Sequence, residues 1–165
     1  MTHLQNKLIE GDQFHYTDFP VYSGEDGLSF KFADCMAHVR YHPAHPNPYA
    51  PEGEHGSGEL VATWIYCEEP EKSEGVLSSG IELMMDSQLA PNASLGLHGH
   101  TRTEEIYYLL EGEVTVSLYT GDKKTVRRLM PGDAHLIKPG QSHFVQAGSH
   151  GARFIVVGAV VQDKA

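Results

Sequence analysis

The segment from His98 to Gly112, HGHTRTEEIYYLLEG, places metal-binding residue types at short and regular spacing. His98 and His100 are two residues apart, and on a β-strand such residues point to the same face. Glu105 follows after a short loop, and His143 lies in the later segment KPGQSHF. Three imidazoles and one carboxylate suit a divalent transition metal such as Fe, Mn, Ni, Co or Zn, with positions left open. We therefore predict one such ion per chain, bound by these four side chains.

Two further side chains are candidates for chemistry beside the metal. If Glu105 points at the metal, strand alternation places Tyr107 in the same cavity. A phenol there could donate a hydrogen bond to a substrate or act as a general base, and packing is the favoured alternative. His135 alternates with Ile137 in AHLIKP. It could line the cavity as an acid or base, or be hydrogen-bonded within the wall, as buried polar groups usually are.

The elements that must position these residues are predicted to be β-strands. Val, Ile, Tyr and Leu recur in short runs that Gly, Pro, Asn and Asp separate. YTGDK at 119–123 is typical of a hairpin turn, and no segment shows sustained helical periodicity. Many short strands with regular turns indicate an all-β sandwich or barrel. The expected strands are 75–85, 93–100, 105–112, 113–119, 125–130, 134–139, 143–147 and 152–161.

The first 74 residues have a less regular pattern of strand-like runs than the rest of the chain. They are predicted to form an N-terminal extension of the barrel at 75–161. Strands are expected at 28–35, 36–41 and 60–67. We expect the extension to add strands to the sheet edge and to contribute to a homodimer, because exposed edges need covering.

Residues 42–59, HPAHPNPYAPEGEHGSGE, are rich in Pro, Gly and His and are predicted to form a long surface loop. His38, His42, His45 and His55 lie in or beside it. They could bind a second metal. The more economical interpretation is a lid that carries polar groups to the mouth of the barrel.

Composition limits the function classes. A chain of 165 residues fits one domain. The formal net charge of −10 argues against nucleic acid as a partner. Cys35 and Cys67 are too few for a disulfide framework. The first residues lack the apolar segment of a signal peptide. No apolar run approaches the length of ~20 residues that a membrane helix needs. We expect a cytoplasmic protein without membrane association.

With these motifs in place, the sequence resembles the cupin superfamily over about residues 75–161. The first cupin motif is G-x5-H-x-H-x3/4-E-x6-G, and the second is G-x5-P-x-G-x2-H-x3-N. The positions that fall on the first are Asn92, His98, His100, Glu105 and Gly112, and those on the second are Gly132, Lys138, Gly140, His143 and Ala147. All four metal-ligand positions match in residue type.

The resemblance also shows where this chain departs from the family. Asn92 replaces a glycine, and asparagine tolerates left-handed backbone angles better than most residues. Lys138 replaces a proline, and Ala147 replaces a frequent asparagine. The motif permits Glu104 or Glu105 as the ligand. The spacing to Gly112 favours Glu105, so Glu104 should face away or lie in the loop.

The resemblance implies a single double-stranded β-helix, or jelly-roll barrel, and a mononuclear metal site. It does not identify the reaction, because one fold hosts many chemistries. We expect an enzyme that acts on a small polar molecule, with dioxygenase chemistry first and lyase or isomerase chemistry next. Tyr107 would be the base in the latter. The alternative class is a non-catalytic sensor or small-molecule binding module.

Overall fold

The computed structural model of the protein describes residues 8–11, 33, 36–67, 77 and 79–161. Within these residues the chain forms nine β-strands, and no helix there is long and apolar enough to cross a bilayer. The strands are β1 (Leu8–Gly11), β2 (Ala37–Tyr41), β3 (Leu60–Cys67), β4 (Ile81–Leu89), β5 (Ser94–Gly99), β6 (Thr103–Thr120), β7 (Lys123–Leu129), β8 (Ala134–Ile137) and β9 (Gln141–Val160).

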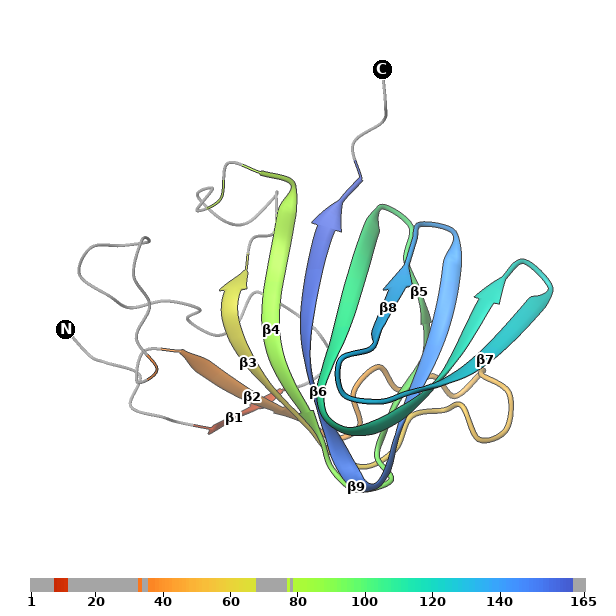
Figure 1. Ribbon diagram of the computed structural model, residues 1–165, viewed down its shortest axis with the longest axis horizontal. Coiled ribbons are helices and arrows are strands. Elements are labelled where there is room, and N and C mark those ends of the chain that lie inside the picture. The colour runs from red at the N-terminus through yellow and green to blue at the C-terminus, as the bar shows by residue number, and fades with distance from the viewer. Residues whose placement is uncertain (1–7, 12–32, 34–35, 68–76, 78, 162–165) are drawn as a thin grey trace.

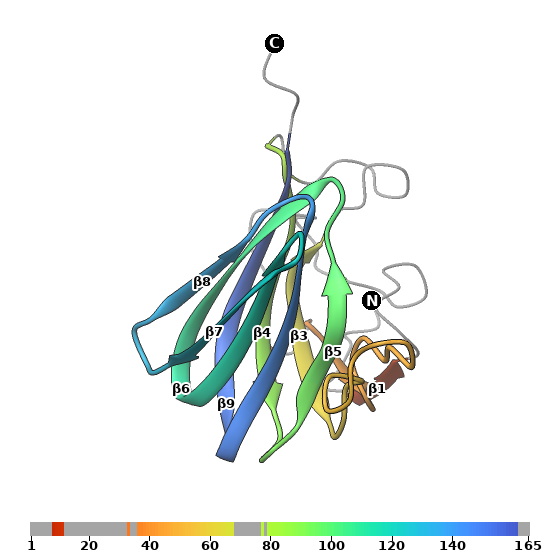
Figure 2. The same cartoon turned by 90° about the vertical axis from the view of Figure 1, so that its right-hand side faces the viewer.

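The two long strands, β6 and β9, build both walls of the barrel (Figure 1). The first half of β6 pairs with the second half of β9 and with β8. The second half of β6 pairs with the first half of β9 and with β7. β4 and β5 then pair with opposite halves of β9. This all-β arrangement confirms the predicted jelly-roll barrel, and Figure 2 shows its strands from the side.

Gly112 lies where the sequence predicted the boundary between two strands at 105–112 and 113–119. The structure has one continuous strand, β6, with register shifts on either side of Gly112. Gly112 has φ of 74°. The prediction of two strands was wrong because this glycine changes the direction of the strand without ending its pairing with β9.

The N-terminal strands continue the barrel wall at its edge, in the order β1-β2-β3-β4-β9. β2 and β3 match the predicted strands, and β1 was not predicted. The predicted strand 28–35 lies outside the described residues except for Ala33. Trp64 on β3 is fully buried opposite Met85 of β4. β1, β2 and β3 therefore lie at the edge of the sheet beside β4, and β3 shares the core of the barrel.

The face of β6 that points inward is the one that the sequence predicted. Glu105, Tyr107 and Leu109 are buried, whereas Ile106 and Tyr108 are 47% exposed on the opposite face. This alternation follows from the two-residue repeat of a strand with one side against the core. The first half of β6 therefore carries a carboxylate and a phenol into the barrel.

Residues 42–59 contain no strand and run along β5, as the prediction of a long loop required. The backbone amide of Gly96 donates to the carbonyl of Ala44, and that of Leu97 donates to the carbonyl of Glu54. These bonds give two backbone amides of β5 partners other than β9, which is a common way to protect a strand edge. The segment is called the strap below.

Candidate metal centre

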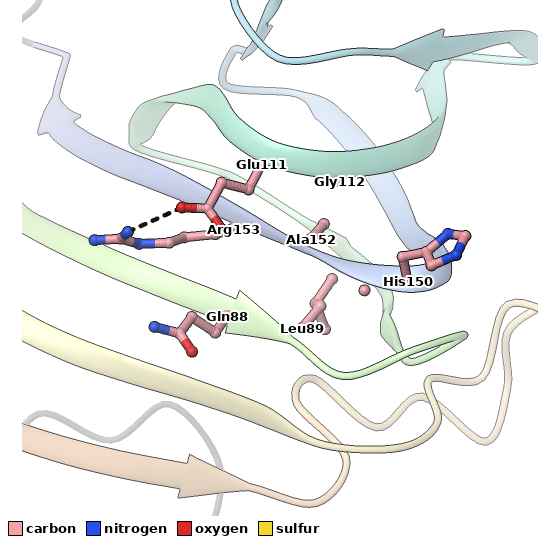
Figure 3. Close-up of a pocket in the computed structure, with 8 residues that line it drawn as sticks. Gln88, Leu89, Glu111, Gly112, His150, Ala152 and Arg153 are labelled. Carbon is pink, nitrogen blue, oxygen red and sulfur yellow. Dashed lines mark hydrogen bonds and ion pairs between the residues drawn. The ribbon is translucent and has the colours of Figure 1, made fainter.

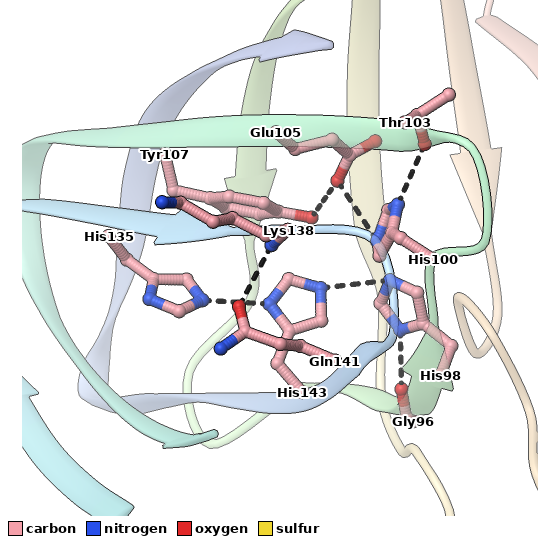
Figure 4. Close-up of polar contacts among 10 residues, drawn as sticks. All are labelled: Gly96, His98, His100, Thr103, Glu105, Tyr107, His135, Lys138, Gln141 and His143. Atoms are coloured by element: carbon pink, nitrogen blue, oxygen red, sulfur yellow. Dashed lines mark hydrogen bonds and ion pairs between the residues drawn. The ribbon is translucent and has the colours of Figure 1, made fainter. Parts of the chain in front are cut away.

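Four side chains converge inside the barrel, and they are the four that the sequence singled out. The potential ligand atoms of His98, His100, Glu105 and His143 all lie within 4.8 Å of one another. His98 on β5 stands directly opposite His143 on β9, and Glu105 comes from β6. His100 follows the end of β5. His143 is fully buried and Glu105 is 8% exposed, so the site lies within the barrel (Figure 4).

Each of the three imidazoles has its Nδ1 atom held by a neighbour, which leaves Nε2 facing the centre of the cluster. His98 Nδ1 lies 2.8 Å from the Gly96 carbonyl oxygen, to which it donates. His100 Nδ1 lies 3.1 Å from the Thr103 hydroxyl. His143 Nδ1 lies 3.0 Å from Nε2 of His135. Such bonds on the outer nitrogen fix the tautomer and the ring orientation of metal-ligating histidines.

The inner nitrogens have few hydrogen-bond partners among the described residues. His98 Nε2 and His143 Nε2 lie 3.0 Å apart. With Nδ1 of His98 donating to Gly96, Nε2 of neutral His98 presents a lone pair, and His143 can donate to it only in the tautomer that carries its proton on Nε2. Among the described residues His100 Nε2 makes no hydrogen bond, and its neighbour is Glu105 Oε2 at 3.5 Å. A cation at the centre would satisfy these atoms together, so the residues present fit one metal ion.

Burial keeps the histidines of the site neutral at physiological pH. Desolvation lowers the pKa of His98 to about 4 and the pKa of His143 well below its usual value. Neutral imidazoles have the free lone pair that a metal ion requires. Burial raises the pKa of Glu105 to about 7, partly offset by the hydrogen bond from Tyr107. A bound cation would favour the ionised carboxylate.

We expect the metal-free protein to lose stability in acid. The pKa of His98 and of His135 is lowered by burial to about 4, and that of His143 is also lowered. An unfolded histidine titrates near pH 6.5. Between about pH 6.5 and 4 the unfolded chain therefore binds more protons, and the free energy of unfolding falls as the pH falls.

Glu105 acts in the opposite direction. Its raised pKa means that the native state holds a proton that the unfolded state releases, so its contribution is lost as the pH rises toward 7. One carboxyl opposes five imidazoles whose pKa values are lowered by burial, and we expect a net loss of stability on the order of a few kcal/mol between pH 7 and 5. Urea unfolding of chelator-treated protein measures it. The His98→Ala/His143→Ala variant should show a flatter profile, and an identical profile would contradict this account.

Tyr107 lies beside the cluster, as strand alternation predicted. Its hydroxyl donates to Oε2 of Glu105 at 3.0 Å, and its ring meets that of His143 edge-on at a centroid distance of 5.2 Å. The side chain therefore both packs in the core and holds the carboxylate. Its assignment as a catalytic residue stays a prediction.

We expect Tyr107→Phe to weaken metal binding without abolishing it. The change removes the donor to Glu105 and keeps the ring, and loss of such a partner of a metal ligand typically reduces affinity about 10- to 100-fold. Titration of chelator-treated protein with Co²⁺ or Zn²⁺ measures the change. Tyr108→Phe, on the outer face of the same strand, is the matched control. Equal affinities of both variants and the wild type would contradict the role of this hydroxyl.

His135 is placed behind His143, not among the four clustered ligands. The bond between its Nε2 and Nδ1 of His143 matches the predicted hydrogen-bonded wall residue. Glu104 stands next to Glu105 on β6 and is absent from the cluster, in line with the choice of Glu105.

His38, His42, His45 and His55 do not form a second metal-binding cluster among the described residues, in line with the less favoured place that this alternative had. His38 bonds to the Thr63 hydroxyl, and His55 bonds to the carbonyl of Ala50. His45 instead stacks on His98, with ring centroids 3.8 Å apart and planes 9° from parallel. The contact between His45 and His98 could not be predicted from the sequence, because no spacing rule connects the two residues.

A pocket of about 320 Å³ lies near the bends of β6 and β9 and shares no residue with the metal cluster (Figure 3). Arg153 at its rim is paired with Asp86 and Glu111. Its guanidinium charge is therefore already compensated. The lining residues are Gln88, Leu89, Glu111, Gly112, His150, Gly151, Ala152 and Arg153.

Comparison with protein families agrees with the fold. Residues 85–158 match the family described as the cupin domain. The match begins within β4 and includes all four clustered residues. Residues 85–158 therefore form a cupin domain. A search of curated proteins found no significant match.

Solved structures with this fold belong to proteins of different kinds. A predicted oxalate decarboxylase from Thermotoga maritima has a TM-score of 0.52 and 25% identity, covering 64% of this chain and 84% of that chain. An oxalate oxidase has a TM-score of 0.51 and 24% identity, covering 69% of this chain and 54% of that chain. A domain of CENP-C from Drosophila melanogaster has a TM-score of 0.54 and 12% identity, covering 81% and 80%. The last two similarities establish the fold alone.

Proposed function

We propose that this protein is a mononuclear metal-dependent enzyme that acts on a small polar molecule. The observation that carries the proposal is the convergence of three Nε2 atoms and one carboxylate inside the barrel, within 4.8 Å of one another. A purely structural histidine cluster would be expected to give its inner nitrogens hydrogen-bond partners. Here Nε2 of His100 has no hydrogen-bond partner among the described residues, and Nε2 of His98 and Nε2 of His143 have only each other.

A metal ion bound by His98, His100, Glu105 and His143 would supply Lewis acidity, a template for substrate, or a site for oxygen activation. The chain's own groups then hold the ligands in place. Gly96, Thr103 and His135 orient the three imidazoles, and Tyr107 orients the carboxylate. Four protein ligands leave positions open for small molecules.

Within this class we propose dioxygenase chemistry first and lyase chemistry second. The second is supported by Tyr107, whose hydroxyl lies close enough to the proposed ligands to exchange a proton with a bound substrate. The similarity to the predicted oxalate decarboxylase also makes small carboxylic acids a reasonable first class of substrates to test. A binding module without catalysis is the alternative, since the fold by itself does not determine a reaction.

Activity measurements can separate these possibilities. Protein purified without an affinity tag is loaded with Fe²⁺, Mn²⁺, Co²⁺, Ni²⁺ or Zn²⁺ and offered small carboxylic acids, thiols, phenols and sugars. A dioxygenase consumes oxygen, whereas a lyase forms product under argon. Binding of a compound by calorimetry without turnover under either atmosphere, with every metal, would favour the binding module.

A further inference from the structure

The strap, residues 42–59, is attached to the barrel at several separate points. Its backbone bonds to Gly96 and Leu97 hold it along β5, and Asn47 Nδ2 donates to the Leu97 carbonyl oxygen at 2.7 Å. Glu54 is buried, and its carboxylate accepts from Tyr119 at 2.7 Å and from Lys124 at 2.6 Å. These contacts join the strap to β5, β6 and β7, so its position relative to the barrel is well determined.

The strap approaches β5 most closely next to the metal site. A Cβ atom added to Gly96 would lie 1.9 Å from the carbonyl oxygen of His45 and 2.8 Å from that of His55. His45 has φ of 49°, a left-handed conformation that is uncommon for residues other than glycine. Such a backbone persists where surrounding contacts over-determine it. The fold therefore holds the backbone of His45 against β5, the strand that carries His98 and leads into His100.

The His45 side chain lies flat on a proposed metal ligand. Its ring stacks on that of His98 at a centroid distance of 3.8 Å with nearly parallel planes. The bond from His98 Nδ1 to the Gly96 carbonyl fixes one edge of the His98 ring but permits rotation about that bond. A ring stacked on the face of His98 restricts this rotation. Together the two contacts determine where the Nε2 lone pair points.

We propose that His45 is a positioning residue that the strap places on His98 to fix the plane of this metal-ligating imidazole. The inference rests on the proposed metal site. It assigns the N-terminal extension a role at the centre of the barrel, beyond its place at the sheet edge. His45 would act through the flat shape of its ring and not by coordinating the ion.

The test compares His45→Ala, His45→Phe and His42→Ala in the full chain by titration with Co²⁺, whose visible absorption reports ligand geometry. His42 is an exposed histidine of the same strap and provides the matched control. Loss of the ring in His45→Ala should reduce affinity about 10-fold or more and change the spectrum. His45→Phe keeps a flat ring and should retain the spectrum and most of the affinity. His42→Ala should match the wild type.

A second measurement does not depend on the metal. In metal-free protein, NMR of the His98 ring protons should show a ring-current shift that disappears in His45→Ala and persists in His45→Phe. A His45→Ala protein with wild-type affinity, spectrum and His98 shifts would overturn the inference and leave the metal site intact. Absence of Co²⁺ binding in the wild type would overturn the metal site, and NMR would still decide whether His45 holds the His98 ring.

Discussion

The double variant His98→Ala/His143→Ala is expected to bind no metal at micromolar concentrations, whereas the wild type should contain about one transition metal ion per chain, as a single four-ligand site requires. A four-ligand zinc site in a small domain yields about 10–16 kcal/mol of binding free energy. If two of four ligands contribute about half of it, their loss reduces affinity by at least about 10⁴-fold. Elemental analysis after gel filtration gives the metal content directly.

A second double variant controls for the general effect of removing histidines. His42 and His150 are both exposed and neither belongs to the cluster. His42→Ala/His150→Ala should therefore retain the wild-type metal content. Full metal content in the His98→Ala/His143→Ala protein would show that the ion is bound elsewhere and would contradict the site.

The Gly112→Ala substitution is expected to be strongly destabilising. Gly112 has φ of 74°, and an added Cβ would lie 2.1 Å from the carbonyl oxygen of Gly151 on β9. The left-handed backbone alone costs an alanine about 1–2 kcal/mol. The clash is with backbone of the strand that pairs with β6, so relief requires these strands to separate. We expect a total loss of about 3 kcal/mol or more, a decrease in Tm of roughly 10 °C.

Gly121→Ala separates the clash from the backbone strain. Gly121 also has a left-handed backbone, with φ of 56°, but nothing lies within 4 Å of the added Cβ. This variant should lose only the ~1–2 kcal/mol of the conformational term. Urea unfolding and calorimetry of both variants measure the difference. Equal losses would show that the contact between β6 and β9 at Gly112 relaxes without cost.

Much of the site could be predicted from the sequence because it depends on local spacing. The two-residue repeat of a strand places Glu105 and Tyr107 on one face whatever the rest of the fold does. The same rule predicts the outward position of Ile106 and Tyr108, which the structure confirms. Asn92, predicted to replace a glycine in a turn, has φ of 60°. These properties belong to the backbone of a few neighbouring residues.

The tertiary structure decided which residues far apart in the chain meet. The register of β5 against β9 brings His98 opposite His143 and leaves their inner nitrogens 3.0 Å apart. The close passage of the strap over Gly96 places His45 on His98. No periodicity encodes such contacts, because they depend on strand pairing and on the path of a loop without regular structure. The sequence by itself determined the types of the candidate ligands and the face of β6 that carries Glu105, and folding determined the side chains that hold and cover them.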